Sequence, residues 1–134
     1  MILNDKARDE ALKYVRDNAD RVLYCNAEPS SYSNADTLVS NGGVKVGERA
    51  VTSSDFSSPT NGDTSGRKIT LDKGGFVAEE TGNVTHLTIV DDDGTEILQI
   101  NQMDDGTGGT VSTTKSLAYN QEPADLEILD ANYA

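Results

Sequence analysis

Three consecutive aspartates, Asp91–Asp93, stand directly before Gly94 in this sequence. Runs of this kind occur in calcium loops of the EF-hand type, which place aspartates at the first, third and fifth positions, glycine at the sixth and glutamate at the twelfth. With Gly94 at the sixth position, Ile89 and Ile100 would stand at the first and twelfth, so two essential ligands are missing. Asp-Gly between two alternating apolar runs instead predicts a hairpin turn. Weak calcium binding by oxygens clustered on the turn remains an alternative.

A second acidic pair, Asp104 and Asp105, precedes a glycine-rich stretch. Gly106 and Gly108 fit the first two glycines of a dinucleotide-binding fingerprint, but Val111 stands where the third glycine is needed. The residues that follow favour a strand, whereas the fingerprint opens a helix. The sequence therefore predicts a flexible turn here, and no cofactor is expected.

His86 is the only histidine and Cys25 the only cysteine of the chain. A serine or cysteine hydrolase would need His86 as its base, but it lies within a strand-like run, and no Gly-x-Ser-x-Gly motif is present. Cys25 lies in an apolar run and is expected to act as a small buried hydrophobic residue. One cysteine and one histidine cannot form a structural zinc site. We therefore expect no catalytic, cofactor-binding or metal-binding residues, and no enzyme activity.

Abundant carboxylates leave a glycosidase as an enzymatic alternative, because such enzymes use a pair of them. Acid pairs in turns are usually only solvated, and aromatic residues that would stack on sugars are scarce, with five Tyr, two Phe and no Trp. The triplet at 83–85 fits an N-glycosylation motif. Because the first residues do not resemble a secretory signal, this motif is expected to be unused.

The net charge of −12 is concentrated in the second half of the chain. Residues 1–73 carry ten Lys and Arg against eleven Asp and Glu, whereas residues 74–134 carry Lys115 alone against twelve acids. Such a surface repels phosphate groups, so neither nucleic acid nor an anionic membrane is expected as a partner. The length of 134 residues suits a single domain, 1–134, with an N-terminal helix or arm (1–19) and a β domain (20–134).

The first element is predicted to be a helix with Asn4 as its N-cap. One apolar stripe recurs at spacings of three and four, made of Ala7, Ala11, Leu12, Val15 and Ala19. Charged residues between them, such as Arg8, are expected to be solvated. Because the stripe is narrow, the helix is expected to pack on a sheet or on a neighbouring subunit.

The rest of the chain alternates as short strands do. Strands are predicted within 21–26, 44–51, 67–72, 75–80, 84–90, 95–101, 111–119 and 125–129. Leu87 and Ile89 are expected to share one face of their strand, as are Leu98 and Ile100. The segments 27–43 and 52–66 are predicted to be long polar loops. The predicted fold is mainly β: an antiparallel β-sandwich or barrel-like sheet with one short N-terminal α-helix.

Three stretches of the sequence, taken in their order along the chain, carry a resemblance to a known group of proteins. They are ALKYVRDNADRVLYCNAEPSSYSNA at 11–35, GRKITL at 66–71 and GNVTHLTIVDDDGTEIL at 82–98. In this order they resemble small structural proteins of tailed bacteriophages, a group found beside capsid genes in phages of alphaproteobacteria. The resemblance covers roughly residues 11–100, and its motifs are not catalytic.

The resemblance implies a non-enzymatic virion component, most similar to a capsid decoration (cement) protein that binds and stabilises the outer surface of the shell. Its partner would be the major capsid protein, and it would itself be a homo-oligomer, with a trimer favoured on the particle. It would be made in the host bacterial cytoplasm and located on the capsid surface of the virion. The alternatives are another virion component (a neck, tail or fibre-attachment protein) or a small glycan- or calcium-binding β module.

Residues 1–19 and the loops at 26–43 and 51–66 are expected to make most intermolecular contacts, since packing the acidic second half against itself would cost repulsion. Lys6, Lys13 and Arg16 would meet an acidic capsid surface. The alternative is that the helix covers the sheet of its own chain.

Overall fold

The computed structural model describes residues 4–62, 66–103 and 110–128, and within them the chain is mainly β with antiparallel sheets and an N-terminal helix, as predicted. The helices are α1 (Asp5–Asn18) and α2 (Tyr32–Ala35), with 3-10 turns η1 (Val39–Asn41) and η2 (Ser53–Asp55). The strands are β1 (Arg21–Cys25), β2 (Lys45–Ala50), β3 (Thr60–Asn61), β4 (Arg67–Leu71), β5 (Gly74–Val77), β6 (Gly82–Val84), β7 (His86–Asp91), β8 (Glu96–Gln102), β9 (Val111–Thr113), β10 (Ala118–Gln121) and β11 (Ala124–Ile128). None of the helices in these ranges has the length and apolar character needed to cross a membrane.

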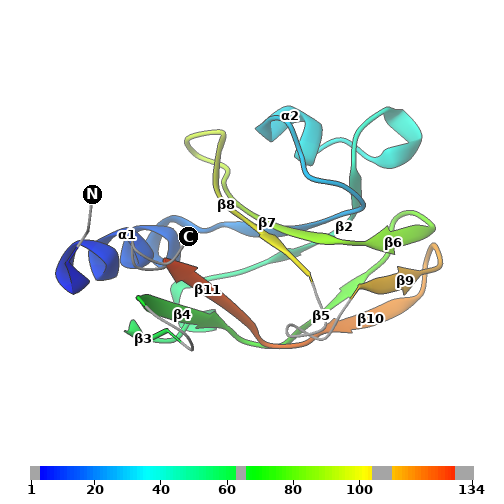
Figure 1. Ribbon diagram of the computed structural model, residues 1–134. Coiled ribbons are helices and arrows are strands. Elements are labelled where there is room, and N and C mark those ends of the chain that lie inside the picture. The colour runs from blue at the N-terminus through cyan, green and yellow to red at the C-terminus, as the bar shows by residue number, and fades with distance from the viewer. Residues whose placement is uncertain (1–3, 63–65, 104–109, 129–134) are drawn as a thin grey trace.

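The strands form a sandwich-like arrangement of sheets. A four-stranded sheet has the order β2-β1-β7-β8, and a three-stranded sheet has the order β11-β4-β3. Two further two-stranded sheets pair β5 with β10 and β6 with β9. In Figure 1, β4, β11 and β10 lie on one side of the four-stranded sheet, which we call its inner side, and α2 lies on the outer side.

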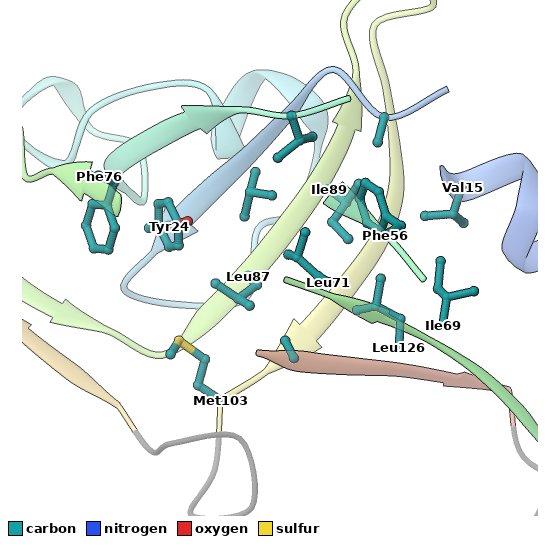
Figure 2. Packing of buried hydrophobic residues seen from close by; sticks show 14 of the residues in the cluster. Val15, Tyr24, Phe56, Ile69, Leu71, Phe76, Leu87, Ile89, Met103 and Leu126 are labelled. Carbon is teal, nitrogen blue, oxygen red and sulfur yellow. The ribbon is translucent and has the colours of Figure 1, made fainter. Parts of the chain in front are cut away.

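The main hydrophobic core lies on the inner side of the four-stranded sheet. Leu87 and Ile89 share this face, as predicted, and pack with Ile69, Leu71 and Leu126 from the second layer (Figure 2). All five side chains are at most 1% exposed. Because burying one large apolar side chain contributes about 1.5–3 kcal/mol, this cluster supplies much of the driving force for folding.

Helix α1 packs on the sheet of its own chain, which is one of the two predicted arrangements. Asn4 caps it, since its side chain accepts a hydrogen bond from the Ala7 N–H at 2.9 Å. Leu12 and Val15 are buried, but Ala11 is exposed and Arg8 is buried, so the prediction was wrong for these two positions. The buried stripe instead runs through positions 8, 12, 15 and 19, with the Arg8 guanidinium bonded to Asp5 at 3.0 Å. A long arginine stem can cover apolar surface while its head stays paired.

Strand β8 departs from the predicted alternation. The register of β7 and β8 shifts between Ile89 and Val90, which is a β-bulge. Leu98 consequently packs against the main core, whereas Ile100 stands opposite Thr88, on the outer face. The prediction that Leu98 and Ile100 share a face was therefore wrong, because an extra residue reverses the alternation.

The two long polar segments contain local structure that packs on their own chain. Segment 27–43 holds α2 and η1, and Ala35 joins Leu23, Cys25 and Val90 in a second apolar cluster on the outer face. Segment 52–66 holds η2 and β3. Two predicted strands are each divided, 84–90 into β6 and β7, and 111–119 into β9 and β10. The predicted turn at 104–109 lies outside the described residues.

Candidate functional site

The only cysteine and the only histidine are neighbours across strands. The antiparallel register of β1 and β7 pairs Cys25 with His86. Directly opposite residues place their side chains on the same face of a sheet, here the outer face. This proximity was not predicted, because the two residues lie far apart in the chain and only the strand register brings them together.

The environment of this pair is structural rather than nucleophilic. Cys25 is fully buried, and burial raises the pKa of its thiol to about 11, so the thiol stays protonated at neutral pH. Its Sγ lies 3.7 Å from the hydroxyl of Thr88, and His86 Nδ1 lies 2.8 Å from the hydroxyl of Thr85. A catalytic cysteine needs the opposite, a lowered pKa in an accessible site. The prediction that Cys25 is a small buried hydrophobic residue is confirmed.

The aspartate run forms the predicted hairpin turn between β7 and β8. The Gly94 N–H donates to Asp91 Oδ1 at 3.2 Å, which closes the turn. The fold also brings in Asp20: one carboxylate oxygen from each of Asp20, Asp91 and Asp93 lies within 4.8 Å of the others. Asp20 was missed because it precedes a different strand, and only the pairing of β1 with β7 places it here.

Hydrogen bonds within the protein occupy much of this acidic cluster. Asp20 Oδ2 accepts a hydrogen bond from the Asp92 N–H at 2.8 Å. The Asp92 carboxylate binds Arg21 through two hydrogen bonds, of 2.8 and 2.7 Å, and accepts a third from the Tyr32 hydroxyl. The Arg21 guanidinium lowers the pKa of Asp92. Calcium takes about six to eight oxygen ligands, so three carboxylates, two of which (Asp20 and Asp91) already accept backbone hydrogen bonds, resemble a turn more than a cation site.

Arg21 also belongs to an ion network on the outer face. Its Nη1 lies 2.8 Å from Asp36 and 2.9 Å from Glu48, and Lys45 Nζ contacts the same two carboxylates at 3.1 and 2.9 Å. Two cations thus link strands β1 and β2 to the segment that carries α2. This network helps to hold the polar segment 27–43 against the sheet.

A groove lies between α1 and β8, and we call it the helix groove. It has a volume of about 480 Å³, and its walls include Ala11, Tyr14, Leu98, Gln99 and Ile128. Tyr14 is 54% exposed, although it is large and partly apolar. The groove therefore offers an apolar surface at one end of the molecule.

Beside the helix groove, two strands present open edges. β8 and β11 are edge strands of their sheets. The Met103 N–H donates a hydrogen bond to the Thr85 carbonyl at 2.8 Å. Hydrogen-bonded and non-hydrogen-bonded residue pairs alternate along an antiparallel ladder, so the backbone N–H and C=O groups of Ile100 and Gln102 point away from β7. An open edge of this kind can pair with an added strand.

A second groove lies beside β5 and β10, and we call it the acidic groove. It has a volume of about 510 Å³, and its walls include Glu48, Phe76, Val77, Glu79, Tyr119 and Asn120. The rings of Phe76 and Tyr119 are 5.9 Å apart, and Val77 is 56% exposed. Neither groove was predicted from the sequence, since each is built from elements that are distant along the chain.

Comparisons of the chain with protein families, with characterised proteins and with solved structures find no match. The likeness to phage structural proteins therefore rests on the three sequence stretches alone. The described residues form two grooves and two open strand edges, which are features that can bind a partner.

Proposed function

We propose that this protein is a non-enzymatic structural component of a tailed-bacteriophage virion, a capsid decoration (cement) protein that binds the outer surface of the major capsid shell and stabilises it. The observation that carries the proposal is the helix groove. It is apolar, it adjoins two open strand edges, and none of the described residues covers it.

The helix groove suits an extended, apolar segment of the major capsid protein. Such a segment would pair with the outward N–H and C=O groups of β8 and place alternate side chains against Leu98 and Ile128. Lys13 and Arg16 stand near the groove on α1, and within the described residues each forms an ion pair with a neighbouring exposed acid, at 3.6 and 2.9 Å. Exposed pairs of this kind contribute little, so both cations remain available to an acidic capsid surface.

The chemistry of the chain's interior supports a non-enzymatic role. Cys25 is buried and its thiol stays protonated, His86 beside it is half-buried, and the acidic turn is held by internal hydrogen bonds. A homo-oligomer, with a trimer favoured on the particle, would bury further surface in a chain with few aromatic residues.

The test uses capsids of the phage that encodes the chain, assembled without this gene. Purified protein is mixed with the capsids, which are then sedimented, and the bound copies are counted. We expect saturable co-sedimentation and a rise in the temperature at which the shells open. Protein that stays in the supernatant would contradict the proposal, and binding to purified tails in place of capsids would favour the other virion roles.

A further inference from the structure

The acidic groove combines apolar walls with a carboxylate that has no partner among the described residues. The exposed Val77 and the half-buried Tyr119 form its apolar wall, whereas Phe76 is only 5% exposed, because its ring stacks on Tyr24. Glu79 is exposed, and its carboxylate makes no hydrogen bond or ion pair within those residues. Glu48 is already neutralised by Arg21 and Lys45. Glu79 is therefore the acid that can accept an incoming cation.

The surroundings of the groove favour a positive ligand over a negative one. Asn120 adds an exposed amide to the same wall. Beyond the groove, Glu80 accepts a hydrogen bond from the Ser40 N–H at 3.0 Å, and Lys115 is the only cation of residues 74–134. An aromatic ring beside a carboxylate suits a cation carried on an aliphatic stem, because the stem packs on the ring and the head pairs with the acid.

We propose that the acidic groove binds a lysine or arginine side chain of an extended segment in a partner protein. The stem of that side chain lies against Val77 and Tyr119, and its charged head pairs with Glu79. The inference rests on the proposed function only for the partner's identity, which would be a basic segment of a capsid subunit. With the helix groove at the other end of the molecule, the protein would then bridge two neighbouring subunits (Figure 1).

The test titrates the full chain with a short capped peptide, acetyl-Ala-Leu-Arg-Leu-Ala-amide, and follows backbone amide shifts by NMR. A second peptide with citrulline in place of arginine removes the charge and keeps the shape. Glu79→Gln is the matched protein variant. Glu10→Gln is its control, because it removes the same charge from α1, at the opposite end of the molecule.

We expect shifts centred on Gly75, Ala118 and Asn120, and a Kd that rises about threefold in Glu79→Gln, as for an exposed ion pair. The citrulline peptide should bind similarly weakly, and Glu10→Gln should bind as the unmodified protein does. Equal binding of both peptides, shifts centred elsewhere or the absence of shifts would overturn the inference. Because no capsid is present, these outcomes do not depend on whether the capsid proposal holds.

Discussion

Helix α1, which lines the helix groove, lies far from β5 and β10, which line the acidic groove (Figure 1), and the two grooves offer a partner different kinds of contact. The first is apolar and borders open strand edges, so it favours burial of apolar surface and backbone pairing. The second places a free carboxylate beside aromatic rings and belongs mainly to the acidic half of the chain. The uneven distribution of charge along the sequence thus gives the protein two surfaces that suit different partners.

The two grooves also depend on different internal supports. The helix groove exists only while α1 stays docked, which Leu12 and Val15 ensure by burial in the main core. The acidic groove depends on Phe76, whose ring stacks on Tyr24 at a centroid distance of 3.9 Å. A substitution that removes the buried contacts holding one groove should therefore leave the other groove in place.

Leu12→Ala should have the largest effect. Leu12 is fully buried, and truncating a buried leucine costs about 2–5 kcal/mol of unfolding free energy, because contacts are lost and a cavity remains. Thermal and urea unfolding measure the loss. Tyr14→Ala, on the exposed face of the same helix, is the control and should cost less than about 0.5 kcal/mol. Equal losses in the two variants would mean that α1 is not docked as described.

Arg21→Gln should come next, because it removes the cation that three carboxylates share. Removing one partner of a buried ion pair costs about 3–5 kcal/mol of unfolding free energy. Because this network is partly exposed, we expect a loss of about 2 kcal/mol. Arg21 lowers the folded-state pKa values of Asp36 and Asp92. Their contribution to the unfolding free energy is therefore complete above the unfolded-state pKa of about 3.9, and it is lost as the pH falls below that value.

The measurement for this variant is the unfolding free energy between roughly pH 3 and pH 7. The unmodified protein should lose stability as the pH drops below about 4, and Arg21→Gln should show a flatter curve over the same range. Lys13→Gln is a control, since that side chain forms only an exposed pair with Glu10. An acid transition of unchanged steepness in Arg21→Gln would argue against the network.

Gly47→Ala should have a moderate effect that is confined to the acidic groove. A Cβ atom at this position would lie 2.9 Å from Cδ2 of Phe76, so the stacked ring must move. We expect a loss of about 1 kcal/mol and weaker binding of the arginine peptide. Amide shifts around Leu98 should stay unchanged. Gly82→Ala is the control, because a Cβ atom there would lie 3.9 Å from its nearest neighbour, Cγ2 of Val46, which is an ordinary contact distance.

Calcium should have the smallest effect. The Asp20, Asp91 and Asp93 carboxylates lie close together, but Asp20 and Asp91 accept backbone hydrogen bonds. We expect the Tm with calcium to differ from the Tm with chelator by less than about 1 °C, because a site that binds weakly adds little stability. A rise of many degrees at low micromolar calcium would show a real cation site.

Local patterns in the sequence predicted much of the fold and little of the surface. Alternation located the strands and the faces of Leu87 and Ile89, and Asp-Gly located the hairpin, because these signals are carried by adjacent residues. The bulge at Leu98 and the burial of Arg8 were not predictable, since both depend on what packs against them. Asp20 beside Asp91–Asp93 required the strand register, which the sequence does not display.

We propose that the protein binds the capsid through both grooves. The direct test counts bound copies per capsid, by co-sedimentation, for the unmodified protein, Tyr14→Ser, Glu79→Gln and the double variant, with matching unfolding curves to establish that each is folded. We expect partial loss of occupancy in each single variant and a larger loss in the double variant. Added salt should weaken binding of the unmodified protein and of Tyr14→Ser more than that of Glu79→Gln. A folded double variant that decorates capsids at full occupancy would show that neither groove holds the capsid.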